Sequence, residues 1–107
     1  MAAPTVEEIV RRDFADAPIM IEIARCESRF RQFDEEGRVL RGEVNPHDVG
    51  VFQINERYHL GVADAKGHNI YKIQGNLAYA RELYIRNGTQ DWDASQGCWR
   101  SATRSPE

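Results

Sequence analysis

A single glutamate, Glu27, stands at the end of an apolar segment and is well placed for acid–base chemistry. The residues from Ile19 to Cys26 are apolar on nearly every side of a helix, with only Glu22 and Arg25 breaking the pattern. A carboxylic acid at the inner end of such a helix is costly to ionise, so its pKa should rise. An acid that keeps its proton near neutral pH can donate it to a leaving group. We therefore expect the rest of the chain to form a groove over Glu27.

A second group of polar residues lies in an apolar run that carries two amides, Gly50-Val51-Phe52-Gln53-Ile54-Asn55. A glycine before such a run indicates a place where something approaches the backbone closely. Asp48, just before this run, offers a second carboxylate. The simpler interpretation is that Glu27 has no chemical task and that the two amides hold the backbone. We assign no metal site and no catalytic role to the scattered histidines, His47, His59 and His68.

Length and composition indicate one small globular domain. The chain has 107 residues, of which 41% are hydrophobic and 29% charged, with a net charge of −3. Basic and acidic residues are mixed, which argues against a nucleic-acid partner. The longest unbroken apolar run, residues 77–80, is too short to span a membrane. Residues 1–4 carry no secretion leader, which fits either a cytoplasmic protein or a module taken from a longer secreted chain.

Two helices are predicted before and at Glu27. Thr5 and Glu8 have the spacing of a capping box, which predicts a first helix that runs to about Phe14. Asp16 is a good N-cap for the second helix, and Pro18 suits its first turn. We expect this second helix to end at residues 27–28, so that its last turn presents the glutamate.

Residues 30–48 are predicted to form a hairpin followed by a loop. Two short extended pieces, residues 30–33 and 38–41, flank the turn-rich residues 34–37. This turn superficially looks like a calcium-binding loop, but it lacks the alternating ligands and the closing glutamate. We therefore predict a β-hairpin and no metal ion here.

The second half of the chain contains one strong helical pattern. Residues 76–87 have an apolar face at helical spacing and end in Asn87-Gly88, a helix stop. Residues 56–59 are predicted as a short helix, and residues 61–67 as a second short helical piece or a loop. Beyond the strong helix, an otherwise polar segment should pack back on the domain through its apolar residues, Trp92, Ala94, Cys98 and Trp99. Residues 100–107 are expected to be a frayed tail.

The two cysteines, Cys26 and Cys98, are the feature of the sequence that bears on whether the protein works in an oxidising or a reducing compartment. As a disulfide they would close a loop over most of the domain, worth roughly 4 kcal/mol in the chain-entropy model. As free thiols they would simply be buried. Their spacing alone leaves both possibilities open.

The chain contains three motifs in this order: Glu27-Ser28-x-Phe30, Gly50-Val51-Phe52-Gln53-Ile54-Asn55 and Asn76-x-x-x-Ala80-x-x-Leu83-Tyr84. Together they resemble the motifs of the lytic transglycosylase (SLT-type)/lysozyme-like superfamily. Enzymes of this superfamily cut the glycan strand of bacterial peptidoglycan. The resemblance covers about residues 17–99. It implies an α+β, mostly helical, lysozyme-like domain over residues 5–99, with a small β-hairpin wall over a cleft and tails at residues 1–4 and 100–107.

The cysteine positions resemble those of resuscitation-promoting factors, which are secreted actinobacterial enzymes with a small lysozyme-like domain. That resemblance implies a Cys26–Cys98 bridge and an oxidising compartment, extracellular or periplasmic at the cell wall, with the leader absent from this chain. The chain departs from these proteins in its longer insert over residues 30–48. It also has Asn55 after the Gln-Ile pair, as in animal lysozymes.

The resemblance implies that Glu27 is the acid/base that cleaves the β-1,4 bond between N-acetylmuramic acid and N-acetylglucosamine. In a lytic transglycosylase it takes the C6 hydroxyl proton of the sugar and gives a 1,6-anhydro product. A hydrolytic lysozyme would also use Asp48, as nucleophile or electrostatic stabiliser. Asp48 can instead cap the turn of residues 45–47, and we favour this structural role. A third possibility is a non-catalytic peptidoglycan-binding module.

Four further residues are candidates for binding the glycan strand: Ser28, Gln53, Asn55 and Tyr79. The Gln53 amide would bond a sugar N-acetyl or hydroxyl group, or hold the hairpin. Ser28 and Asn55 can serve the glycan or cap helix ends, and capping is favoured for Ser28. Either Tyr79 or Tyr84 is expected to point its hydroxyl at Glu27. Trp92 and Trp99 would stack on sugars or, as we favour, pack against the bridge.

We expect a monomer without cofactor. The sequence does not decide endo or exo action, or a phage, secretion-system or cell-wall-growth setting.

Overall fold

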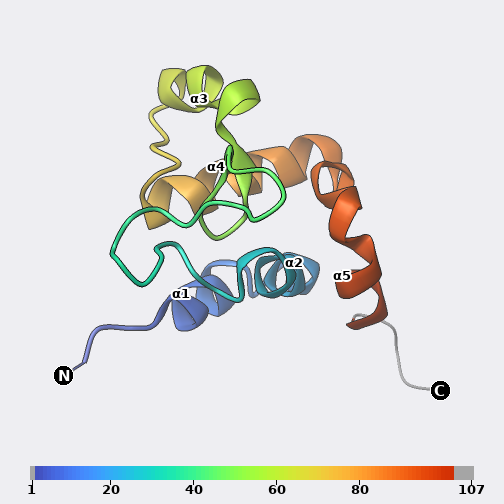
Figure 1. Ribbon diagram of the computed structural model, residues 1–107. Coiled ribbons are helices and arrows are strands. Elements are labelled where there is room, and N and C mark those ends of the chain that lie inside the picture. Colours follow the sequence, from blue (N-terminus) through green and yellow to red (C-terminus); the bar gives the residue numbers. More distant parts are fainter. Residues whose placement is uncertain (1, 103–107) are drawn as a thin grey trace.

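The computed structural model describes residues 2–102 (Figure 1). Within this range the chain is mostly helical with one small antiparallel sheet, so the predicted α+β class is confirmed. In Figure 1, α4 runs through the middle of the molecule, with α3 above it and α1 and α2 below. The elements in chain order are α1 Val6–Asp13, α2 Pro18–Ser28, β1 Asp48–Val49, β2 Ile54–Asn55, α3 Glu56–Ala65, α4 Ile73–Asn87, the 3-10 helix η1 Gln90–Ser95 and α5 Gln96–Ala102.

The helices α1 and α2 follow the sequence prediction, except at one cap. The Thr5 hydroxyl accepts from the Glu8 amide at 3.1 Å, and the Glu8 carboxylate accepts from the Thr5 amide at 3.1 Å, which confirms the capping box. The predicted N-cap Asp16 is wrong, because Ala17 takes that position without a side-chain bond. The Asp16 carboxylate instead pairs with both terminal nitrogens of Arg81 on α4, at 2.9 and 3.0 Å.

The hairpin predicted at residues 30–41 forms only in part. An isolated bridge joins Phe33 to Val39, and the Leu40 amide donates to the Gln32 carbonyl at 2.9 Å, but no regular strand develops there. A second isolated bridge joins Arg41 to Val49, and the two-stranded sheet lies further on, where β1 pairs with β2. Left-handed backbone at Arg29 (φ 54°) and Phe30 (φ 59°) turns the chain where the first strand would begin. The small sheet places Asp48 directly opposite Asn55.

The helices α3 and α4 are longer than predicted. Residues 56–65 form one helix, α3, in place of the separate pieces expected within residues 56–67. Asn55 caps its N-terminus by accepting from the amides of Arg57 and Tyr58. The helix α4 starts three residues before the predicted Asn76 and ends at Asn87 as predicted. Among the described residues, no helix is both long and apolar enough to cross a membrane.

The C-terminal segment is helical rather than frayed. The predicted tail from residue 100 is wrong as far as Ala102, where α5 ends, and residues 103–107 lie outside the described part of the chain. The predicted packing of this segment against the domain is confirmed for Trp92 and Trp99, which are both buried, whereas Ala94 and the disulfide-bonded Cys98 are exposed. The Trp92 indole nitrogen donates to the Phe52 carbonyl at 2.9 Å, which ties η1 to the loop between β1 and β2.

Two buried amides hold the loop between β1 and β2. The Gln32 side chain accepts from the Val51 amide at 2.9 Å, and the Asn76 side chain accepts from the Phe52 amide at 2.9 Å. A Cβ atom at Gly50 would lie 2.3 Å from the Asn76 amide nitrogen and 2.6 Å from the Gln32 oxygen. The close approach predicted at this glycine is therefore real, and the approaching groups are side chains of the same protein.

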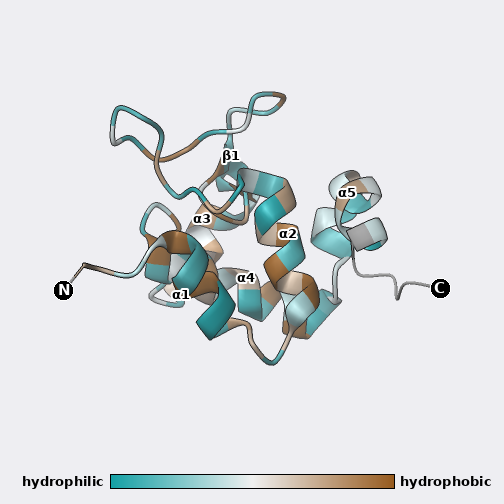
Figure 2. Ribbon diagram, turned by 90° about the horizontal axis from the view of Figure 1, so that it is seen from below, coloured by the Kyte–Doolittle hydropathy of each residue, from teal (hydrophilic) through white to brown (hydrophobic). Residues whose placement is uncertain are grey.

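A disulfide joins Cys26 at the end of α2 to Cys98 in α5. The pairing implied by the resemblance is therefore present. Figure 2 shows α2 between α1 and α5, with apolar stretches along its length. The bridge connects α2 and α5 across a sequence separation of 72 residues.

Opening this bridge should destabilise the protein strongly. In the chain-entropy model, a loop of this length predicts a loss of roughly 4 kcal/mol from the free energy of unfolding. Urea unfolding of the oxidised protein and of the Cys26→Ala/Cys98→Ala variant measures the difference. An equal unfolding free energy in both proteins would contradict the expectation.

Candidate active site

Glu27 lies in the last turn of α2 and is partly buried. Burial raises its pKa, in the direction that the sequence predicts, and the negative charge of Asp48 raises it further. The Ser95 hydroxyl lies 2.5 Å from Glu27 Oε2, and this hydrogen bond acts in the opposite direction, lowering the pKa. Glu27 therefore holds its proton to a higher pH than an exposed glutamate does.

Two hollows meet at Glu27, because both are lined by Glu27, Asp48 and Gln53. The smaller has a volume of about 140 Å³ and lies toward α3 and η1. The larger has a volume of about 570 Å³ and lies toward the loop of residues 40–45. Together they make a trough, and Glu27 and Asp48 line both of its parts. The other polar residues of the smaller hollow are Asn55, His59 and Asp91, and those of the larger are Ser28, Arg29, Arg31, Arg41, Glu43 and Asn45.

The Asp48 carboxylate lines both hollows and does not close the nearby turn. Its Oδ1 accepts from the Asn55 side chain at 3.1 Å. The turn of residues 45–47 is closed by Asn45, whose side chain accepts from the His47 amide at 3.0 Å. Burial raises the pKa of Asp48, whereas the Asn55 hydrogen bond and the nearby His47 lower it. The favoured capping role is thus not the one that this carboxylate has in the structure.

Gln53 is both a structural and a groove residue. It adopts left-handed backbone (φ 49°), and its amide nitrogen donates to the Gly50 carbonyl at 2.9 Å. A Cβ atom at Gly42 would lie 2.9 Å from Gln53 Oε1, so the glycine makes room for this side chain. The amide is therefore fixed in one orientation while it lines both hollows.

The remaining candidates for glycan binding are used mainly inside the protein. Ser28 is buried, donates to the Ala24 carbonyl and accepts from the Arg31 amide, so its hydroxyl is used at the end of α2, although Arg29 is the C-cap of this helix. It still lines the larger hollow. Asn55 lines the smaller hollow, but both ends of its amide are engaged, by Asp48 and by the first turn of α3.

Neither tyrosine provides a described hydrogen bond to Glu27. Tyr79 is buried, and its hydroxyl lies 2.8 Å from His59 Nδ1. Tyr84 is partly buried against the core. The hydroxyl that does meet Glu27 belongs to Ser95, which carried no signal in the sequence. It lies in a short 3-10 helix, and the contact joins residues 68 positions apart.

His59 is another groove residue that the sequence analysis did not assign. It lines the smaller hollow, and burial lowers its pKa, which favours a neutral ring at neutral pH. Its position four residues after Asn55 places both on one face of α3. The predicted helical piece at residues 56–59 already contains this relation, so the spacing of Asn55 and His59 could have indicated the histidine.

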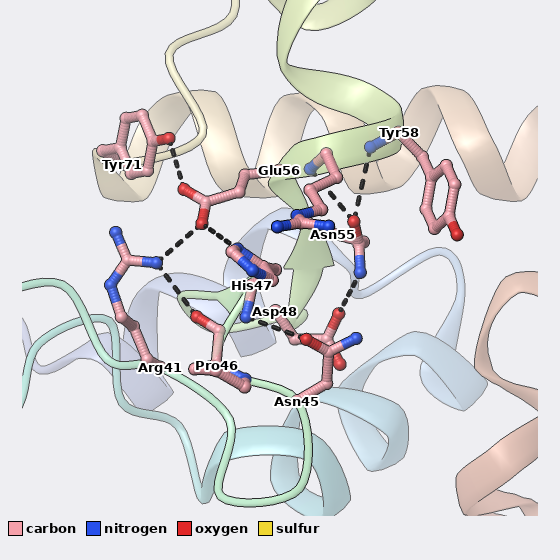
Figure 3. A network of polar contacts seen from close by, with 10 residues as sticks. Arg41, Asn45, Pro46, His47, Asp48, Asn55, Glu56, Tyr58 and Tyr71 are labelled. Carbon is pink, nitrogen blue, oxygen red and sulfur yellow. Dashed lines mark hydrogen bonds and ion pairs between the residues drawn. The ribbon is translucent and has the colours of Figure 1, made fainter.

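Glu56 fastens the wall of the larger hollow to α3 (Figure 3). Its Oε2 accepts from Arg41 Nη1 at 2.8 Å and lies 2.8 Å from His47 Nδ1, and its Oε1 accepts from the Tyr71 hydroxyl at 2.7 Å. These bonds, that of Arg41 most of all, lower the pKa of Glu56 from 4.5 to about 2. Arg41 also donates to the Pro46 carbonyl, so the loop is held at both of its ends.

The sequence matches no protein-family model, no curated protein and no solved structure. Within residues 2–102, no group of three or more histidine, cysteine, aspartate or glutamate side chains is arranged to hold a metal ion. A function must therefore be argued from the trough and its two carboxylates.

The Glu56→Gln variant should be less stable at neutral pH by roughly 2 kcal/mol, because it weakens several charge-assisted hydrogen bonds. The pKa of Glu56 is depressed in the folded protein, so its stabilising effect is present above pH 4.5 and is lost as the pH falls toward about 2. The difference between native protein and variant should shrink over that range in urea unfolding. The matched control is Glu36→Gln, whose exposed pair with Arg38 should contribute little. A difference that persists at the lowest pH would contradict this assignment.

Proposed function

We propose that this protein cleaves the glycan strand of bacterial peptidoglycan at the β-1,4 bond between N-acetylmuramic acid and N-acetylglucosamine, as a lytic transglycosylase. The observation that carries the proposal is the position of Glu27. It is a partly buried carboxyl group with a raised pKa, at the point where two hollows meet. An extended polymer lying along both hollows would pass directly over it.

The proposed reaction uses Glu27 twice. As an acid, Glu27 gives its proton to the bridging oxygen while the bond from that oxygen to C1 of the muramic acid breaks. As a base, the resulting carboxylate takes the proton of the C6 hydroxyl on the same sugar, and that oxygen bonds to C1. Glu27 regains its proton, no water is consumed, and the product is a 1,6-anhydro-muramyl end.

The other groups of the trough fit a sugar polymer. Its lining offers amides, a neutral histidine and arginines, which can bond hydroxyl and N-acetyl groups. Gln53 is held rigid by the Gly50 carbonyl, so it can position a sugar without first losing conformational freedom. The disulfide is consistent with an oxidising, extracellular setting, and we place the protein at the cell wall as a monomer.

Asp48 favours a second candidate, a hydrolytic lysozyme. Its carboxylate lines the same two hollows as Glu27 and raises the pKa of Glu27 by its charge. In that reaction Asp48 would attack C1 or stabilise its positive charge, and water would complete the cleavage. The product would then carry a reducing end. A trough that binds peptidoglycan without cutting it is the non-enzymatic alternative.

Mass spectrometry of muropeptides released from purified sacculi separates these functions. Native protein should release anhydro-muramyl products, and Glu27→Gln should reduce the rate on the order of 10²- to 10⁴-fold, because the acid/base group is lost. Asp48→Asn should retain most of the activity of a transglycosylase and lose that of a lysozyme.

Glu36→Gln is the matched control, because it makes the same substitution at an exposed glutamate that lines neither hollow. It should leave the rate nearly unchanged. Reducing ends in place of anhydro ends would establish the lysozyme. A native protein that binds sacculi but releases nothing, or a fully active Glu27→Gln variant, would exclude Glu27 catalysis.

A further inference from the structure

The Ser95 hydroxyl lies among three hydrogen-bonding groups, one of which is the Glu27 carboxyl. Its Oγ is 2.5 Å from Glu27 Oε2, 3.1 Å from the Trp92 carbonyl and 3.1 Å from the indole nitrogen of Trp99. The contact with Glu27 has the length of a charge-assisted O–H···O⁻ bond, which is stronger than a neutral one. Ser95 is therefore the direct hydrogen-bonding neighbour of the proposed acid.

The protons of this cluster can be counted. An indole nitrogen only donates, so Trp99 uses one lone pair of the Ser95 oxygen. The single proton of Ser95 then has two possible acceptors, the Trp92 carbonyl and Glu27 Oε2. An ionised carboxylate only accepts. When Glu27 is ionised, Ser95 therefore donates to Oε2, the nearer of the two acceptors, and the bond from Trp99 strengthens that donation.

We propose that Ser95 is a positioning residue for Glu27, whose hydroxyl binds Oε2 and so leaves Oε1 as the oxygen that carries the proton toward the substrate. This rests on the proposed function of Glu27 as acid and then base. In the acid step the proton leaves Oε1 for the bridging oxygen, and Ser95 stabilises the carboxylate that forms. In the base step Oε1 takes the proton back. The Ser95 proton stays on Ser95 throughout.

The fold braces this contact from both sides. The disulfide joins Cys26 and Cys98, which are the immediate neighbours of Glu27 and Trp99. Ser95 ends η1 just before α5 begins, and α5 packs against α2. The bridge therefore holds the end of α2 against the residues that hydrogen-bond its glutamate. Such restraint is what a group needs to keep one orientation through two proton transfers.

The groups around Glu27 determine how its pKa should respond to the loss of the Ser95 hydroxyl. The titratable and charged side chains that share its two hollows are Asp48, His59 and Asp91 in the smaller one and Arg29, Arg31, Arg41, Glu43 and Asp48 in the larger one. Burial and Asp48 raise the pKa of Glu27, and the Ser95 hydrogen bond lowers it. Removal of the Ser95 hydroxyl should therefore raise this pKa.

Carbon-13 NMR titration of the Glu27 side-chain carboxyl tests the proposal without any need for activity. The pKa should rise in Ser95→Ala and stay near the native value in Ser95→Thr, which keeps the hydroxyl. Ser101→Ala is the matched control, because it removes an exposed hydroxyl of α5. In Ser95→Ala the Trp99 indole still donates to the Trp92 carbonyl at 3.2 Å, so this variant should fold. An unchanged or lowered pKa in Ser95→Ala would overturn the proposal.

Kinetics on sacculi give the second readout. The first step needs protonated Glu27, so a higher pKa in Ser95→Ala should move the alkaline limb of the pH profile to higher pH. Its kcat should fall on the order of 10- to 100-fold with little change in KM, because the carboxyl loses its fixed orientation. Ser95→Thr should restore both.

The outcomes separate the two proposals. A native protein that releases nothing from sacculi refutes the proposed function, while the NMR titration still decides the role of Ser95. A fall in kcat with the titration and the alkaline limb both unmoved would make Ser95 merely structural and overturn the proposal.

Discussion

The candidate active site depends on keeping the Glu27 carboxyl group, at the end of α2, partly out of water. Burial is the largest influence on Glu27, and burial alone would leave the charged form poorly solvated. One short hydrogen bond from Ser95 stabilises the charged form, so Glu27 can still ionise. That balance needs η1 and α5 to stay against α2, which the disulfide and the buried tryptophans ensure.

The opposite side of the trough is held by polar groups inside the core. Gln32 and Asn76 are almost fully buried, and their amides hydrogen-bond the loop between β1 and β2. Asn76 also donates to the Val49 and Ile70 carbonyls, so one side chain joins three segments of the chain. Buried amides with every bond satisfied fix a unique arrangement, which a purely apolar core does less well. The positions of Gln53 and Asp48 in the trough depend on that loop.

The pKa of Glu56 and the pKa values of Glu27 and Asp48 shift in opposite directions. Glu56 bonds Arg41, His47 and Tyr71, and its pKa falls to about 2, as expected for a structural charge. Glu27 and Asp48 are dominated by burial, and the pKa of each rises. A carboxyl group that remains paired cannot exchange protons near neutral pH, whereas a desolvated one can. The contrast is what distinguishes the trough from the rest of the surface.

The sequence by itself determined the features that depend on neighbours in the chain. The capping box at Thr5, Pro18 in the first turn of α2 and the end of α4 at Asn87 are local, and each was predicted. So was the direction of the Glu27 pKa, because an apolar helix predicts its own burial.

Tertiary structure decided what joins distant segments. Ser95 meets Glu27 across 68 positions, and Asp16 leaves its expected cap for Arg81 across 65. The sheet forms at β1 and β2 rather than in residues 30–41, because Gln32 and Asn76 hold the loop that joins the two strands. Such contacts leave no periodic trace in a sequence, since their energy comes from hydrogen bonds that exist only once the core has closed.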